Sequence, residues 1–514
     1  MIWTNNEPID PRIGVHDRNQ FEMKLDYQVH PEKRVNRYRT DIWFFVPKSL
    51  GIGPYTYTRD QFYADTQTYI RFKTPRYTLQ SLTDTQNKRS PLVRIRKLAN
   101  RFQNDPRSEE AVSRLIYEVR LLGAALRAES RDQATLIHAK ILGAKEAREA
   151  ESLDVSDACA LWSRMMAELE PVLAALRELR PTLLAAGFTA EVMEAHAYVD
   201  EFVSISLEAH LARLIKATRE DARIREALAA PYEAARERIA SERRHRARAG
   251  YPSLISREGT NEEYIYRRGV LKKFVTGVLF LNVRVEREGQ RLAQFIAAVA
   301  AGVAMLLAVV ATIVTQRHYA MDSMAFVTLA VLTYMVKDRL KDGLRLYFFD
   351  KLGSTLADHR VRIIDPGTRQ EIGSCRESMT FVRGESMPSD VVRARNRTSL
   401  SVVEAEGKPE NVIRYRKDVS IRTDRVIGDK RRVSDINDII RFNVSQFLIH
   451  MDDHIAPLHY YDTVRDEIVE LEGNKVYHLN VVYGFSTEPR KPPETLQRLR
   501  VVMDKRGIRK LHAI

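Results

Sequence analysis

The chain has 514 residues, of which 44% are hydrophobic and 29% are charged, and its formal net charge is +14. This composition excludes an intrinsically disordered chain and supplies enough apolar material for two or three packed domains. The excess of positive charge favours an anionic neighbour, and because the chain also carries long apolar segments, we expect that neighbour to be anionic membrane lipid rather than nucleic acid.

Residues 1–104 are predicted to form a β-rich N-terminal domain. Apolar and polar residues alternate over 21–30 (FEMKLDYQVH), a period of two that predicts a strand with one buried face. The stretch 37–46 (RYRTDIWFFV) follows a polar turn, and we expect it to pair with that strand. Gly51 and Gly53 lack the third glycine of a dinucleotide-binding fingerprint, so they predict a loop.

Residues 105–250 are rich in alanine, leucine, arginine and glutamate and are predicted to be helical. Asp105 and Pro106 give an N-cap acid followed by proline at the first helical position. Further helices are expected over 156–186, with prolines as breaks or starts at Pro171 and Pro181, and over 189–229. An antiparallel bundle is favoured over a coiled-coil arm because no strict heptad repeat persists.

Two basic groups separate this helical region from the apolar segments. The first ends the helical region and comprises Arg243, Arg244, Arg246 and Arg248. The second lies in a juxtamembrane segment, 251–291, and comprises Arg267, Arg268, Lys272 and Lys273. Both are candidates for contact with lipid headgroups. The alternatives are a solvated helix end or a nucleic-acid contact for the first group, and a buried helix of a soluble domain for the second.

The stretch 292–316 (LAQFIAAVAAGVAMLLAVVATIVTQ) has no formal charge, and as a helix it would be about 37 Å long, more than the roughly 30 Å of bilayer hydrocarbon. A second apolar run over 323–336 (SMAFVTLAVLTYMV) follows a short polar link. We therefore predict a transmembrane helical hairpin over 292–336, followed by a juxtamembrane helix over 337–356. A buried hairpin in a soluble core is the alternative.

The flanking charges predict the orientation of this hairpin. Basic residues lie on the outer side of both apolar runs, at Arg284, Arg287, Arg291, Lys337, Arg339, Lys341 and Arg345. The positive-inside rule then places both termini in the cytoplasm, and we expect an integral protein of the bacterial inner membrane. Cys159 and Cys375 cannot form a disulfide framework and fit a reducing compartment.

Residues 357–514 are predicted to form an α+β C-terminal domain. A hairpin is expected from HRVRII (359–364) through a turn into EIGSC, and further strands are expected at 413–421 and 477–485. We predict a helix over 433–451, whose apolar residues recur at helical spacing. The last residues form a hairpin with Gly507 in its turn. The fold class is thus an α+β membrane protein, in which N- and C-terminal strands could share a sheet.

Chemical motifs are mostly absent from the sequence: it has no phosphate-binding loop, no GxSxG, no HExxH and no paired CxxC. One group could hold a metal ion, because imidazoles spaced by four on a helix can face the same ligand position. This group comprises His450, Asp453, His454 and His459. The ordinary interpretation, a polar helix end with hydrogen-bonded histidines, is favoured over a metal site, and no cofactor is expected.

Three hypotheses for function follow. The leading one is a membrane-anchored, cytoplasm-facing scaffold, assembly or signalling protein without a catalytic site, which binds an unidentified protein partner. The second is a homo-oligomeric pore or transport subunit, in which small residues pack helices of different copies tightly, at Ala297, Ala298, Ala301 and Gly302. Packing of the hairpin against itself is the alternative for these four residues, and it is favoured. The third is a membrane-tethered enzyme with an unrecognised site. The layout resembles other proteins held by a two-helix hairpin, but no residue-level motif supports that resemblance.

Overall fold

The computed structural model describes residues 13–104, 109–146, 155–286, 289–319, 323–353, 357–396, 410–427, 435–487 and 495–513. The chain folds as two compact units. The β unit contains the residues up to Ile70 together with Leu281–Gly428 and Asp435–Ile514, and the helical unit is built on Arg71–Phe280. In sequence, the helical unit is therefore an insertion into the β unit.

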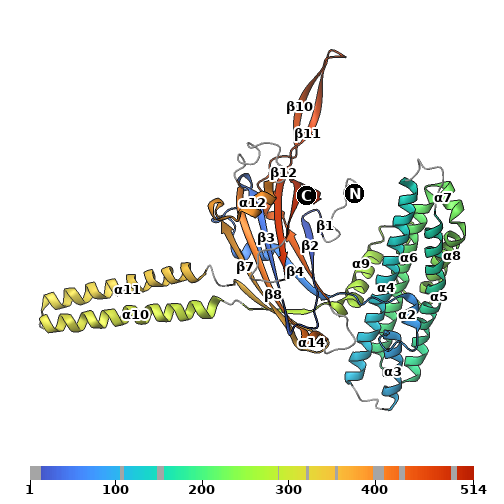
Figure 1. Ribbon diagram of the computed structural model, residues 1–514, viewed down its shortest axis with the longest axis horizontal. Helices are drawn as coiled ribbons and strands as arrows, with labels where there is room; N and C mark the ends of the chain where they lie inside the picture. The colour runs from blue at the N-terminus through green and yellow to red at the C-terminus, as the bar shows by residue number, and fades with distance from the viewer. Residues whose placement is uncertain are drawn as a thin grey trace. The chain divides into compact units, whose positions relative to one another are not determined.

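The larger sheet of the β unit joins distant parts of the chain (Figure 1). Among the described residues it has eight antiparallel strands, in the order β14 (Gly507–Ala513), β13 (Leu496–Asp504), β12 (Tyr477–Ser486), β3 (Val35–Pro47), β8 (Glu410–Arg422), β7 (Glu371–Val382), β6 (His359–Ile364) and β5 (Asn282–Glu286). The N-terminal strand β3 lies between two strands from the C-terminal region. N- and C-terminal strands do share a sheet, as the sequence permitted.

A smaller sheet packs on one face of the larger one. Its described strands follow the order β1 (Ile13–Asp17), β2 (Gln20–Tyr27), β9 (Ile436–Asn443) and β4 (Thr66–Phe72). The rings of Phe44 on β3 and Phe442 on β9 stack with centroids 4.7 Å apart and join the two sheets. The predicted strand at the start of the chain is confirmed as β2, but its predicted partner is wrong, because β2 pairs with β1 and β9.

The predicted helix over 433–451 is also wrong, because the described part of this range begins with strand β9. Burial alternates strictly along β9: Ile436, Asp438, Ile440 and Phe442 are buried while the residues between them are half-buried. The apolar residues fit a helical period and a period of two equally well, and pairing with β2 decides between them. The helical part is confined to α15 (Ser445–Leu448).

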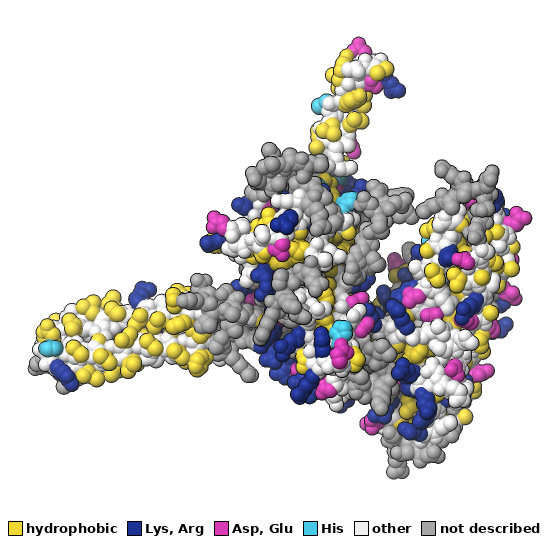
Figure 2. Space-filling view, viewed as in Figure 1, with side chains coloured by type: hydrophobic (Ala, Val, Ile, Leu, Met, Phe, Trp, Pro, Cys, Tyr) yellow, Lys and Arg dark blue, Asp and Glu magenta, His cyan; other side chains and the backbone are white. Residues whose placement is uncertain are grey.

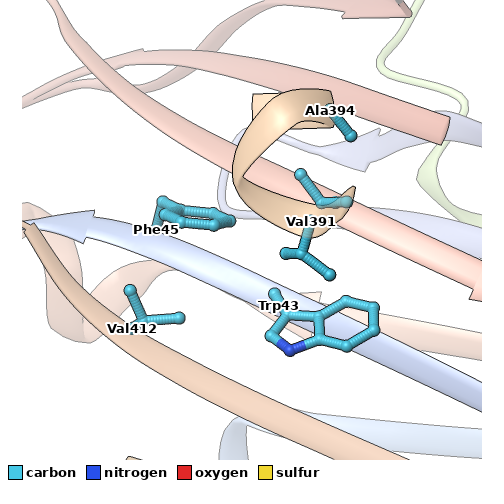
Figure 3. Close-up of a cluster of buried hydrophobic side chains, with 6 residues drawn as sticks. Trp43, Phe45, Val391, Ala394 and Val412 are labelled. Atoms are coloured by element: carbon cyan, nitrogen blue, oxygen red, sulfur yellow. The ribbon is translucent and has the colours of Figure 1, made fainter. Parts of the chain in front are cut away.

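The opposite face of the larger sheet carries a second hydrophobic cluster (Figure 3). Helix α12 (Ser389–Asn396) places Val391 and Ala394 over Trp43, Phe45 and Val412 of the sheet. The remaining short elements of the unit are η1 (Lys48–Leu50), α1 (Arg59–Asp65), η3 (Gly384–Ser386) and α14 (Thr423–Ile427), and a two-stranded ribbon is formed by β10 (Ile455–Asp462) and β11 (Glu467–Asn474).

The helical unit is an antiparallel arrangement of long helices. Its described helices are α2 (Leu79–Thr83), α3 (Pro91–Asn104), α4 (Glu109–Glu146), α5 (Ser156–Ala185), α6 (Ala190–Arg219), α7 (Ala222–Ala227), α8 (Ala229–Arg248), α9 (Glu262–Thr276) and the turn η2 (Gly277–Leu279). Helix α6 packs against α4, α8 and α9. The predicted breaks at Pro171 and Pro181 do not occur, because α5 continues through both prolines. The predicted start at Asp105 and Pro106 lies outside the described residues.

The predicted membrane fold with a two-helix transmembrane hairpin is wrong, and the structure is an α+β fold. In the described part of the chain, one helix, α10 (Gly289–His318), contains a segment long and apolar enough to cross a bilayer, Gln294–His318. Its neighbour α11 (Met324–Gly353) contains no such segment, because charged residues begin at Lys337. The apolar part of α11 before Lys337 is about 20 Å long at the rise of an α-helix. By itself, one such helix does not define a membrane protein.

A buried ionic cluster lies between the two sheets of the β unit. Lys417 on β8 is fully buried, and its Nζ lies 2.6 Å from the carboxylate of Asp438 on β9 and 3.4 Å from that of Glu377 on β7. Tyr27 donates a hydrogen bond of 2.8 Å to Asp438, and Tyr415 donates one of 3.0 Å to Glu377. Burial alone would lower the pKa of Lys417, but the charges of these two carboxylates outweigh burial and raise it.

We predict that Lys417→Met destabilises the β unit by about 3–5 kcal/mol, because it leaves two buried carboxylates without their cation. Hydrogen exchange of peptides from β8 and β9 under native conditions measures this loss. The exposed Lys510→Met on β14 makes the same chemical change at the surface and serves as the control. Equal protection of β8 and β9 in both variants would contradict a structural role for the cluster.

Candidate functional site: an exposed apolar arm

Helices α10 and α11 lie side by side and form the feature that we call the apolar arm (Figure 1). Only 17% of the most apolar window of Gln294–His318 is buried, whereas a core helix of a soluble domain is mostly buried. Its large side chains are therefore open to the surroundings (Figure 2). The most exposed of them on α10 are Phe295, Met305, Leu306, Leu307, Val310 and Val314.

The two helices of the arm meet along a stripe of small residues. Ile296, Ala300, Ala304 and Thr315 are the buried positions on α10, and the half-buried positions on α11 include Phe326, Ala330 and Thr333. Alanine at this spacing lets two helix backbones approach closely. The predicted packing residues lie beside this stripe: Ala297 and Ala301 are half-buried, whereas Ala298 and Gly302 are exposed. Packing of the latter two against another chain stays a prediction.

Polar and aromatic side chains mark both ends of the arm. At its tip, Arg317 and His318 are exposed, and Tyr319 is 46% exposed. Toward the other end of α11, the exposed charged residues are Asp338, Arg339, Lys341, Asp342 and Arg345, and Tyr334 and Tyr347 are exposed as well. Lys337 lies over the ring of Tyr334, with its Nζ 3.9 Å from the centroid. The apolar surface thus extends along α10 to its polar tip, whereas on α11 it ends at Lys337, near the middle of the helix.

The predicted basic group at the end of the helical region is partly held inside the helical unit. Arg246 is 1% exposed, and its guanidinium donates to Ser204 at 2.8 Å and pairs with Glu208 on α6. Arg243 donates to Glu208 at 2.7 Å. Arg244 and Arg248 are exposed. Half of this group is therefore engaged in packing α8 against α6, and the other half is open to solvent.

The second predicted basic group lies on α9, which packs into the helical unit. Leu271 and Val275 of this helix are buried. Arg267 forms an ion pair of 2.6 Å with the buried Glu201, while Arg268, Lys272 and Lys273 are exposed. One side of α9 therefore belongs to a soluble core, the alternative that the sequence left open for this segment, and its basic side faces outward.

The four predicted metal-site residues do not come together. The structure shows no group of three or more histidine, cysteine or acidic side chains that could hold a metal ion among the residues it describes. His459 lies on strand β10 of the ribbon, and Asp453 forms an ion pair of 2.8 Å with Lys505. The predicted helix that would have aligned His450 and His454 does not extend to them. The arrangement offers no coordination geometry at these positions.

Sequence reasoning missed a polar network in the helical unit. The buried Asp200 on α6 lies 2.7 Å from His245 Nε2 and accepts a hydrogen bond of 3.0 Å from Tyr251. Arg177 on α5 donates to Asp200 at 3.3 Å and to Glu242 on α8 at 2.7 Å. Burial would raise the pKa of Asp200, but the hydrogen bond from His245 and the charge of Arg177 lower it overall. The network joins α5, α6 and α8.

Neither a family model, a curated protein nor a solved structure matches this chain. The function must therefore be argued from the molecule itself. The apolar arm is the feature least compatible with an isolated soluble protein, because each large apolar side chain left in water costs about 1.5–3 kcal/mol relative to burial.

We predict that Ala304→Leu disturbs the arm and that Ala298→Leu does not. Ala304 faces α11, so three added carbons overpack the contact and cost about 1–3 kcal/mol, whereas Ala298 is exposed. Hydrogen exchange of α10 peptides in detergent micelles measures the effect. The second readout is the particle mass from light scattering: a change caused by Ala298→Leu alone would show that this face packs between copies.

Proposed function

We propose that this protein is a membrane-anchored scaffold or signalling protein, whose apolar arm embeds in a lipid bilayer and whose two compact units bind a protein partner. The exposed apolar surface of α10 is the observation that carries this proposal. A bilayer removes such a surface from water on all sides, which a single groove on a soluble partner cannot do.

The ends of the arm support lipid as its surroundings. Tyrosines are enriched where hydrocarbon meets headgroups, and Tyr319 lies at the tip of this arm and Tyr347 toward the end of α11. Arginine and lysine extend their charged ends toward headgroup phosphates, and Arg317 at the tip and Arg345 toward the end of α11 are exposed. A protein partner would not require cations and aromatic side chains at both ends.

The strand pairing of β5 and β6 constrains how the arm can enter a bilayer. Strand β5 ends at Glu286, just before α10, and β6 begins at His359, just after α11. Glu286 pairs with Arg360, so the chain leaves and re-enters the same sheet edge. Because α10 cannot cross alone under this constraint, and because the apolar part of α11 is about 20 Å long, we propose that the arm lies within one leaflet.

The basic residues of α11 suggest which side of the membrane carries the two units. Basic residues of α11, among them Lys337, Arg339, Lys341 and Arg345, lie near the point where the chain returns to the β unit. By the positive-inside rule this favours the cytoplasmic face. We therefore propose that the protein resides on the cytoplasmic side of the bacterial inner membrane, with its partner in the cytoplasm.

Replacing Leu306, Val310 and Ile313 together by aspartate is expected to abolish flotation of the protein with lipid vesicles, because three charges would enter the apolar surface of α10. Flotation on a density gradient with phosphatidylcholine vesicles measures binding. The control replaces three exposed apolar residues of the β10–β11 ribbon, Leu458, Ile468 and Leu471, by aspartate. Flotation of both variants alike would contradict anchoring by the arm.

A cysteine placed at Tyr319 tests the depth of the arm. In a background with Cys159 and Cys375 replaced by alanine, we expect Tyr319→Cys to react only with an impermeant maleimide added outside sealed vesicles. An arm within the outer leaflet keeps its tip on the side from which the protein was added. Reaction with reagent trapped inside the vesicles would show that the arm crosses and would overturn the one-leaflet arrangement.

A further inference from the structure

The outer face of the larger sheet, opposite the smaller sheet, is rich in arginine. Side chains directly opposite one another in an antiparallel sheet share a face, so the register identifies the members of this set. The arginine face comprises Arg37 on β3, Arg284 on β5, Arg360 and Arg362 on β6, Arg376 on β7 and Arg422 on β8. Arg37, Arg284, Arg376 and Arg422 are exposed.

Four of these arginines form two pairs of like charges directly opposite each other across neighbouring strands. Arg284 on β5 is opposite Arg362 on β6, and Arg360 on β6 is opposite Arg376 on β7. Like charges at such positions destabilise a sheet. Glu286 and Asp418 offset part of this repulsion, and guanidinium groups gathered on one face can also bind an anion from outside the chain.

Further arginines on the same side of the sheet form ion pairs, and the carboxylates of these pairs are fewer than the arginines on this side. Toward the middle of the sheet, Asp41 lies 2.9 Å from both Arg414 and Arg416, and Asp418 lies 2.6 Å from Arg39. At the edge formed by β5, β6 and β7, Glu286 is paired with Arg362 at 3.2 Å. Arg284 and Arg376 of the same edge are exposed, and Arg376 lies opposite Asp418 of β8.

We propose that the arginine face binds the phosphate groups of anionic lipid headgroups. This inference rests on the proposed function, because it requires the arm to bring the β unit to a membrane. Strands β5 and β6 connect directly to α10 and α11, so the arginine-rich edge is the part of the sheet that the chain ties to the arm. Guanidinium groups bind phosphate through paired hydrogen bonds, which suits repeated contact with a headgroup layer.

The place of the arginine face in the sheet favours lipid over nucleic acid as the source of phosphate. The charge excess lies at the sheet edge from which the arm departs, whereas a nucleic-acid surface would have no reason to be attached to an apolar arm. Arm and arginine face then act together: the arm gives affinity for any bilayer, and the arginine face adds a preference for anionic bilayers.

The test compares vesicles of phosphatidylcholine alone with vesicles in which a third of the lipid is phosphatidylglycerol. The arginine-face variant carries Arg284→Gln, Arg376→Gln and Arg422→Gln. The control variant carries Arg114→Gln, Arg164→Gln and Arg236→Gln in the helical unit, which removes the same charge from exposed positions. Full-length protein is used throughout, and thermal unfolding confirms that both variants are folded.

The wild type and the control variant should bind the anionic vesicles at least about tenfold more tightly than the neutral ones at low salt. The arginine-face variant should bind both kinds of vesicle equally, at the wild-type affinity for the neutral ones. High salt should also abolish the preference of the wild type for anionic vesicles, because it screens exposed charges. This second measurement requires no substitution in the protein.

Two outcomes would overturn the inference, and a third would refute the proposed function. An anionic preference that persists in the arginine-face variant refutes this face as its source. If the arginine-face variant lost binding to a single-stranded oligonucleotide while its vesicle binding stayed at the wild-type level, the face would be assigned to nucleic acid. Failure of the wild type to bind either kind of vesicle would instead refute the proposed function, so the two failures are distinguishable.

Discussion

The position of β3 in the middle of the larger sheet is the constraint on which the rest of the structure depends. Residues 35–47 pair with residues 410–422 on one side and with β12 on the other. After β3 the chain leaves this sheet and returns to it at β5, and it leaves again between β5 and β6. The helical unit and the apolar arm are two such excursions, and the arm begins and ends at neighbouring strands.

The ionic cluster around Lys417 fixes how the two sheets meet. A purely apolar interface tolerates small shifts of one sheet over the other, whereas the pairing of Lys417 with Asp438 and Glu377 is satisfied in one arrangement. Tyr27 and Tyr415 donate to the same two carboxylate oxygens that face Lys417, one from each side. We infer that the cluster contributes specificity more than net stability, since its charges lose their hydration on burial.

Local sequence patterns predicted the strands in which buried and exposed residues alternate. They did not predict the secondary structure of segments in which pairing with a distant strand selects strand over helix. Strand β2 and the final hairpin around Gly507 follow from the sequence alone, since alternation and a left-handed glycine are local properties. The helix expected over 433–451 is the strand β9, because its apolar spacing suits both periods and β2 selects the strand. The hydropathy of α10 was evident, but the arginine face was not, since five strands distant in sequence assemble it.

The two proposed membrane contacts differ in what they can contribute. An apolar arm binds lipid through area removed from water and does not distinguish one headgroup from another. A face of guanidinium groups distinguishes headgroups by charge but binds weakly alone, because salt screens exposed charges within about 10 Å. Joined through β5 and β6, the arm raises the local concentration of headgroups at the arginine face, so weak contacts become effective. The preference of the arginine face for anionic headgroups then depends on ionic strength, whereas anchoring by the apolar arm does not.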